Sequence, residues 1–144
     1  MKCINETKFN FPAKSTNEAF ARSAVAAFIM QLDPTISELA DIKTSVSEAV
    51  TNSIVHGYKG QGGTIYITVQ IFENGVVSIK IRDKGCGIED IEKAMEPLFT
   101  TGGDERAGLG FAVMQSFMDS IRVSSKPLKG TTVTLKKKII KNDP

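Results

Sequence analysis

The hydrophobic positions of the chain first follow the spacing of helices. Ile42, Val46, Ala49 and Ile54 recur at three- and four-residue steps, which predicts an amphipathic helix that ends near residue 56. An earlier apolar stripe predicts another helix over residues 15–32, with a capping box formed by residues 15–18. Between them, Asp33 is expected to cap the second helix and Pro34 to occupy its first position. Gly57 is expected to end that helix in a left-handed conformation.

The strands follow a different spacing, in which apolar and polar residues alternate. Residues 65–71 and 77–81 alternate on either side of Asn74-Gly75, which predicts an antiparallel hairpin. Phe9 and Phe11 predict an earlier strand, which Pro12 favours placing at a sheet edge.

The last third of the chain completes the predicted order of elements. Residues 121–123 and 131–140 predict two further strands, and residues 89–95 and 111–118 two short helices. The order is strand, two helices, two strands, two shorter helices, two strands. It predicts one domain over residues 1–144, an α+β two-layer sandwich with helices on one face of a largely antiparallel sheet.

Composition narrows the class of protein. The chain has 144 residues, 41% of them hydrophobic and 24% charged, which is typical of one globular domain. The net charge of +2 does not suggest a nucleic-acid binder, and we interpret Lys136, Lys137, Lys138 and Lys141 as a solvated strand end. Two cysteines give no disulfide or metal pattern, and no apolar run approaches about 18 residues, so we expect a cytoplasmic protein without membrane contact.

Three polar residues of the second predicted helix share one stripe. Glu48, Asn52 and His56 are each four residues apart, so their side chains stand one above another beside the apolar stripe. This arrangement fits either a solvated helix face or a chemical site.

Two glycine-containing loops favour the chemical interpretation. Asp83 follows a strand and precedes Gly85 and Gly87, where backbone without Cβ atoms can approach a ligand closely. Gly108-Leu109-Gly110 is expected to lead into a helix N-terminus, which binds phosphate through free N–H groups, and Arg106 can add a charged fork. Neither loop is a Walker or a Rossmann motif.

These motifs together resemble a known family. Glu48-x-x-x-Asn52, Asp83-x-Gly85-x-Gly87, Gly108-Leu109-Gly110 and Gly130-Thr131-Thr132 occur in the order and approximate spacing of the Bergerat ATP-binding fold, found in the gyrase and histidine-kinase ATPases. Within that superfamily the chain resembles the anti-sigma factor serine kinases. The similarity runs over about residues 11–140.

The resemblance implies roles for individual residues. Glu48 corresponds to the general base, Asn52 to the amide that holds Mg²⁺ against the ATP phosphates, and Asp83 to the acceptor for the adenine amino group. Thr131 corresponds to a threonine that supports adenine through its hydroxyl. The other implied ATP-site residues are the base and ribose positions Gly85, Gly87 and Ile88, the lid of residues 100–106 with Thr100, Thr101 and Arg106, and the phosphate-cradling backbone of Gly108, Leu109, Gly110 and Phe111.

The resemblance also implies a function. Such proteins phosphorylate a serine of an anti-anti-sigma protein with Mg·ATP, and as homodimers hold a sporulation sigma factor, here expected to be sigma F, inactive. Arg22 and the lid are candidate partner surfaces. Two alternatives remain open: a histidine kinase catalytic domain, and a nucleotide-gated binding module without turnover.

Overall fold

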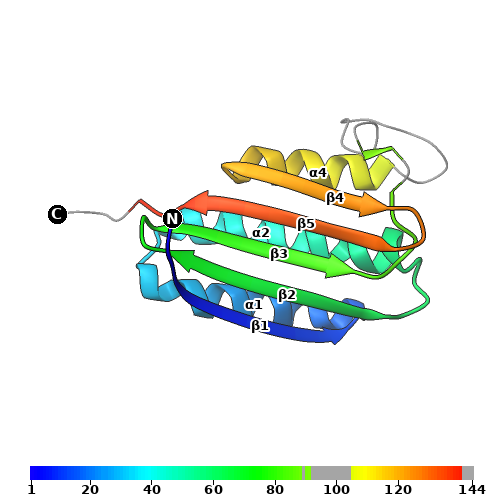
Figure 1. The fold of residues 1–144 in the computed structure, drawn as a ribbon, viewed down its shortest axis with the longest axis horizontal. Coiled ribbons are helices and arrows are strands. Elements are labelled where there is room, and N and C mark those ends of the chain that lie inside the picture. The colour runs from blue at the N-terminus through cyan, green and yellow to red at the C-terminus, as the bar shows by residue number, and fades with distance from the viewer. Residues whose placement is uncertain (89, 92–104, 141–144) are drawn as a thin grey trace.

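The protein is a single antiparallel sheet covered on one face by helices (Figure 1). The computed structural model describes residues 1–88, 90–91 and 105–140. Five strands lie in the order β1-β2-β3-β5-β4, and every neighbouring pair is antiparallel. Their bounds are β1 Cys3–Pro12, β2 Thr64–Phe72, β3 Val76–Asp83, β4 Ser120–Lys126 and β5 Gly130–Lys138. The predicted α+β architecture is confirmed, and β1 lies at an edge as Pro12 suggested.

The helices are α1 (Glu18–Ile29), α2 (Ile36–Asn52) and α4 (Glu105–Phe117), with short 3₁₀ helices η1 (Ser15–Asn17) and η2 (Met30–Leu32). A π-helical turn, η3 (Ser53–Gly57), extends α2. The Tyr58 N–H donates to the Ser53 carbonyl over 2.8 Å, an i→i+5 bond, so the four-residue stripe of side chains does not continue regularly to His56.

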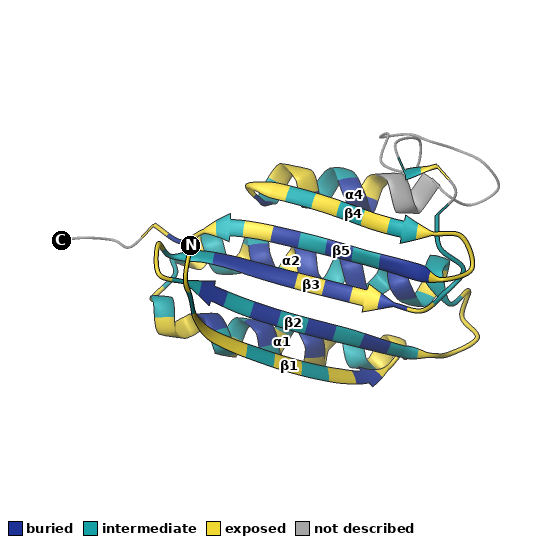
Figure 2. Ribbon diagram, viewed as in Figure 1, coloured by how far each residue is buried: buried dark blue, intermediate teal, exposed yellow. Residues whose placement is uncertain are grey.

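The core lies between the helices and the central strands (Figure 2). In β2 every second residue is fully buried, as the alternation in its sequence predicted, whereas β4 at the edge has no residue in the fully buried class. The largest fully buried side chains come from α1, α2, α4 and strands β2, β3 and β5: Ile29, Ile42, Ile65, Ile67, Ile71, Ile79, Ile81, Met114 and Leu135.

The predicted helix caps are wrong in detail. Residues 15–17 form η1, and no side chain caps α1. The capping box instead belongs to α2: Thr35 Oγ1 accepts the N–H of Glu38 at 3.1 Å, and the Glu38 carboxylate accepts the N–H of Thr35 at 2.9 Å. Asp33 has a left-handed conformation (φ 53°) that ends η2, so it cannot cap α2.

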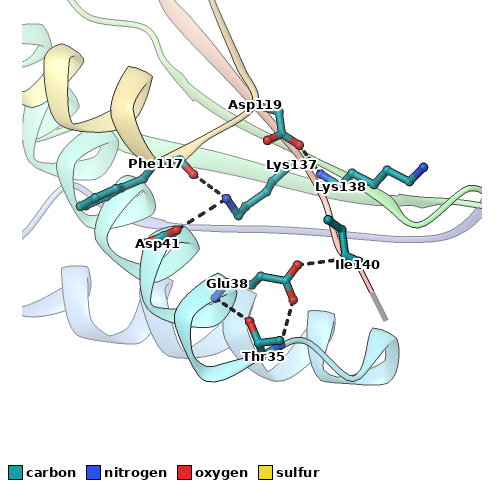
Figure 3. A network of polar contacts seen from close by, with 8 residues as sticks. All are labelled: Thr35, Glu38, Asp41, Phe117, Asp119, Lys137, Lys138 and Ile140. Atoms are coloured by element: carbon teal, nitrogen blue, oxygen red, sulfur yellow. Dashed lines mark hydrogen bonds and ion pairs between the residues drawn. The ribbon is translucent and has the colours of Figure 1, made fainter. Parts of the chain in front are cut away.

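The C-terminal strand is attached to α2 by a polar network that the sequence interpretation missed (Figure 3). Lys137 is not a solvated residue of a basic run, because its side chain is only 13% exposed. Its Nζ lies 3.6 Å from Asp41 of α2 and donates to the carbonyl of Phe117, the last residue of α4, over 2.7 Å. One lysine thus joins α2, α4 and β5.

Glu38 forms a second attachment at the same end of α2. It accepts the N–H of Ile140 at 2.9 Å in addition to that of Thr35. Burial acts to raise the pKa of Glu38, but the hydrogen bonds from Thr35 and Ile140 and the charge of Lys137 outweigh it and lower the pKa below its usual value.

Candidate functional site

The opposite end of α2 meets the end of β3 at Asp83. This aspartate is only 4% exposed and lies directly against Gly57 of η3. A Cβ atom at Gly57 would stand 2.8 Å from Asp83 Oδ2. Gly57 has no left-handed backbone, contrary to the sequence prediction, since positive φ angles come later, at Lys59 and Gly60. Close packing against the carboxylate explains this glycine.

The two oxygens of the Asp83 carboxylate differ in the hydrogen bonds that they accept. Oδ1 accepts the N–H of Gly85 at 3.0 Å and the N–H of Thr131 at 3.3 Å. Oδ2 receives no hydrogen bond from the part of the chain that the structure describes. A buried carboxylate oxygen without a donor is suited to accept an N–H group from a ligand.

The segment after Asp83 is held by backbone contacts on both sides. The Cys86 N–H donates to the Gly57 carbonyl over 2.8 Å, and the Leu128 N–H donates to the Cys86 carbonyl over 2.6 Å. A Cβ at Gly85 would overlap the backbone of Gly57, and one at Gly87 would overlap the Lys126 carbonyl. Both glycines therefore allow close approach of backbone to backbone in this structure.

Tyr58 fixes this region from the side. Its hydroxyl donates to the Thr64 carbonyl over 2.6 Å and accepts the Lys84 N–H at 2.7 Å. The tyrosine thereby joins the end of η3 to the start of β2 and to the residue after Asp83. The sequence interpretation missed this role of Tyr58.

Glu48 and Asn52 lie together against α4 rather than on a solvated face. A Cβ at Gly110 would stand 3.0 Å from Glu48 Oε2 and 3.4 Å from both amide atoms of Asn52. Gly110 itself is buried, and the two polar side chains are half-buried. The predicted pairing of carboxylate and amide on one stripe is confirmed, and the missing side chain of Gly110 makes room for it.

Asn52 has the properties of a group that meets a ligand. Its Nδ2 atom is buried and has no hydrogen-bond partner among residues 1–88, 90–91 and 105–140. Because no hydrogen bond within the described residues fixes the Nδ2 atom, the amide can turn its oxygen towards a cation. These described residues contain no group of three or more His, Cys, Asp or Glu that could hold a metal by themselves. A single amide oxygen at this position fits Mg²⁺, which binds through few protein oxygens and keeps water and phosphate ligands.

The two clusters are close in space. Asn52 ends α2 and Gly57 ends η3, the π-helical turn that extends it, so the amide-bearing residue and the residue that touches Asp83 are five residues apart on one continuous helical segment. The η3 turn also contacts β3 and β5. A carboxylate acceptor and a carboxylate–amide pair thus occupy neighbouring positions at one end of the molecule.

The helix that was expected to follow Gly108-Leu109-Gly110 begins before this motif. α4 starts at Glu105, not near residue 111, so Gly108, Leu109 and Gly110 lie inside it. The first four N–H groups of a helix are free, and here they belong to residues 105–108. The amides of Leu109, Gly110 and Phe111 are within the helix, and Phe111 packs in the core at 2% exposure. Thr100 and Thr101 lie outside the described residues, and of Arg106 only the backbone is described.

Thr131 and Ile88 lie near Asp83 at the same end of the sheet. Thr131 pairs with Asp83 in the β3–β5 register and is 8% exposed, while Ile88 is half-buried against the core. Ser125 of β4 pairs with Thr131 on its other side. The sequence interpretation missed Ser125, although its position two residues after Val123 continues the inward-facing stripe of β4.

Comparison with known proteins identifies the family to which this fold belongs. The histidine kinase-like ATPase domain family matches residues 11–137. An anti-sigma F factor from Priestia megaterium is 55% identical over 135 residues, which cover 92% of each chain. Another from Clostridium botulinum (strain Eklund 17B / Type B) is 59% identical over 136 residues, which cover 93% of this chain and 94% of that one.

Solved structures show the same fold. The RsbU and RsbW domains of Rv1364c from Mycobacterium tuberculosis align with a TM-score of 0.68 and 20% identity, covering 94% of this chain and 32% of that chain. A histidine kinase domain from Erythrobacter litoralis EL346 aligns with a TM-score of 0.56 and 18% identity, covering 85% of this chain and 60% of that one. None of the helices described here has the length and apolarity to cross a membrane.

The family match spans most of the chain, and the anti-sigma F factors match it over nearly its whole length and theirs. The chain therefore belongs to the histidine kinase-like ATPase domain family and, within it, to the family of anti-sigma F factors.

Proposed function

We propose that this protein is a cytoplasmic, Mg·ATP-dependent protein kinase that phosphorylates a serine of an anti-anti-sigma protein and holds a sporulation sigma factor, sigma F, inactive. The observation that carries the enzymatic part is the placement of the Glu48 carboxylate beside the Asn52 amide against Gly110. A module that only binds nucleotide has no need for a carboxylate beside the metal-binding amide.

The adenine end of the proposed site is formed by β3, β5 and the segment after β3. Asp83 Oδ2 would accept a hydrogen from the 6-amino group of adenine, with Thr131 beside it and Ile88 along the ring. Gly85 and Gly87 let this segment lie close to η3 and to the β4–β5 turn, so backbone contacts within the chain hold it in place without a nucleotide. ATP and ADP share these contacts.

The phosphate end lies between α2 and α4. The free N–H groups of residues 105–108 at the start of α4 would face phosphate oxygens, and the Asn52 amide oxygen would hold Mg²⁺. The bound cation would screen the phosphate charge, which is the main requirement of phosphoryl transfer. Arg106, Thr100 and Thr101 are proposed to close over the phosphates.

Glu48 is proposed to act as the general base. The carboxylate takes the proton of the acceptor serine hydroxyl as the hydroxyl oxygen attacks the γ-phosphorus and ADP leaves. Glu48 stands one turn before Asn52 on α2, so base and cation ligand are held by the same rigid helix.

Partner binding is proposed for the face of α1 and for the lid. Arg22 on α1 lies 3.4 Å from Ser47 Oγ and 3.9 Å from Glu18, and its side chain is 38% exposed, which leaves it accessible to a partner. We also propose a homodimer, for which the unpaired edge of β1 offers one surface. Light scattering of the purified protein measures its mass in solution directly.

The test is transfer of label from γ-labelled ATP with Mg²⁺ to a purified anti-anti-sigma protein and to its serine-to-alanine variant. Glu48→Gln should retain ATP binding and lose transfer by about 100-fold or more. Glu73→Gln, at an exposed position of the β2–β3 turn, is the matched control and should transfer normally. Weak ATP binding by Glu48→Gln would instead mean that this carboxylate is structural.

The same assay separates the alternatives. Acid-labile label would indicate a histidine kinase domain. Measurable ATP binding without any label on the acceptor would indicate a nucleotide-gated binding module.

A further inference from the structure

Ser125 connects β4 to β5 and to the segment after β3 through one hydroxyl group, at the end of the sheet where Asp83 lies. The Ile88 N–H donates to Ser125 Oγ over 2.8 Å. Ser125 Oγ donates to the Gly130 carbonyl over 3.0 Å and lies 2.8 Å from Thr131 Oγ1. Ser125 is half-buried on the helix-covered face of the sheet, directly opposite Thr131 in the β4–β5 register.

The number of hydroxyl hydrogens decides whether Thr131 donates or accepts in its contact with Ser125. A serine hydroxyl has one hydrogen to donate and two lone pairs to accept. The Ile88 N–H can only donate, and the Gly130 carbonyl can only accept. All three contacts are hydrogen bonds only if Ser125 donates to Gly130 and Thr131 donates its own hydroxyl hydrogen to Ser125.

The Thr131 hydroxyl can then only accept a hydrogen bond from a ligand, because its own hydrogen is used towards Ser125. Its neighbour across the β3–β5 pair is Asp83, which is also an acceptor through Oδ2. Two adjacent acceptors favour a ligand that presents an amino group and disfavour one that presents a carbonyl oxygen. If Thr131 were free to rotate, its hydroxyl could donate to such an oxygen and weaken the discrimination.

We propose that Ser125 is a positioning residue that fixes the hydroxyl hydrogen of Thr131 away from the pocket, and thereby makes the site select 6-amino over 6-oxo purine nucleotides. This inference rests on the proposed function, since it concerns the base-binding end of the same ATP site. Ser125 touches no nucleotide atom in this account and acts only through Thr131 and the backbone of Ile88.

The test measures the dissociation constants of ATP and inosine triphosphate by calorimetry, with the full chain. Inosine triphosphate carries an oxo group where ATP carries the 6-amino group. In Ser125→Ala the preference for ATP, expressed as the ratio of the two dissociation constants, should fall about two- to tenfold. This range corresponds to the typical contribution of one hydrogen bond. Ser124→Ala is the matched control: Ser124 is exposed on the other face of β4, its side chain has no hydrogen bond within the described residues, and the ratio should stay unchanged.

A purely structural role of Ser125 would weaken both nucleotides equally and leave the ratio unchanged, which would overturn the inference. Thr131→Val should lower the ratio by itself, and adding Ser125→Ala to it should lower the ratio no further. An unchanged ratio in Thr131→Val would also overturn the inference, and this test remains available if Ser125→Ala is unstable. A further fall of the ratio in the double variant, as large as that in Ser125→Ala alone, would overturn the inference as well. If the wild-type protein binds ATP but the ratios fail as described, only the inference about Ser125 is overturned. If the wild-type protein does not bind ATP, the proposed function and the inference are both overturned.

Discussion

Replacement of Asp83 by asparagine tests how the proposed site recognises adenine. In the structure Oδ1 accepts the N–H groups of Gly85 and Thr131, while Oδ2 lies against Gly57 and has no donor among the described residues. Asparagine has the same shape and can keep its oxygen at the Oδ1 position. An NH₂ donor then replaces the Oδ2 acceptor, so the variant inverts the hydrogen-bonding character of that single position.

The magnitude follows from the contacts. A hydrogen bond to a charged acceptor contributes about 1.5–3 kcal/mol, so ATP affinity should fall roughly 10- to 150-fold. The fold should lose only about 1 kcal/mol, because both backbone N–H groups keep an acceptor. Asp83→Ala is a poorer test, since it also removes the acceptor of the buried Thr131 N–H, at about 1–3 kcal/mol, and that of the part-buried Gly85 N–H.

Calorimetric titration of wild type and Asp83→Asn with ATP and inosine triphosphate measures the effect. The variant should lose ATP affinity and hold or gain affinity for the 6-oxo nucleotide. Asp33→Asn is the control, because Asp33 is exposed and its left-handed backbone suits asparagine well. Equal losses for both nucleotides in Asp83→Asn would refute the assignment of this carboxylate to the 6-position.

Three further variants test the contact of Gly110 with Glu48, the attachment through Lys137 and the charge of Glu38. Gly110→Ala places a methyl group 3.0 Å from Glu48 Oε2, so phosphoryl transfer should fall more than ATP affinity, while thermal unfolding should show no loss of stability because alanine favours helix by up to about 1 kcal/mol. Lys137→Met removes the partner of Asp41 and of the Phe117 carbonyl and should cost about 1–3 kcal/mol in denaturant unfolding, whereas exposed Lys136→Met should change it by about 0.5 kcal/mol or less. Because the pKa of Glu38 is lowered in the folded state, its charge stabilises the fold above the unfolded pKa of about 4.3, and that contribution is lost as the pH falls through the lower folded pKa. The unfolding free energies of wild type and Glu38→Gln should therefore converge as the pH is lowered below about 4.3, and a constant difference would contradict this.

The strands could be predicted because their signals are local. Alternation in β2 and β3 and the Asn74-Gly75 turn between them are properties of neighbouring residues, and the structure confirms both. Helix ends were predicted less well. Thr35 and Ser15 each precede an acidic residue by three positions, but only Thr35 makes the capping box, because residues 15–17 are drawn into the 3₁₀ turn that follows β1.

The site could be predicted only as far as its residues share one helix or one loop. Glu48 and Asn52 are one turn apart, so their pairing follows from helix geometry. Their contact with Gly110 joins α2 to α4 over about sixty residues of sequence, and no local spacing encodes it. The role of Gly57 is similar: the sequence suggested a turn residue, whereas the Asp83 carboxylate opposite it is what leaves no space for a side chain.

The strands contain a signal that the sequence interpretation did not use. Along β3, β5 and β4 the inward-facing stripes are apolar in the middle and become polar at one end of the sheet, at Asp83, Thr131 and Ser125. Each residue alone looks like an ordinary strand end. The register places them side by side, with Asp83 opposite Thr131 and Thr131 opposite Ser125. A polar residue on an otherwise buried stripe needs a hydrogen-bonding partner, and here the partners come from adjacent strands. At the other end of the sheet, Lys137 continues the stripe of Val133 and Leu135 in the same way and joins α2 to α4. Polar residues that continue an apolar stripe therefore identify both ends of this sheet, one for attachment of the helices and one for the proposed recognition of the base.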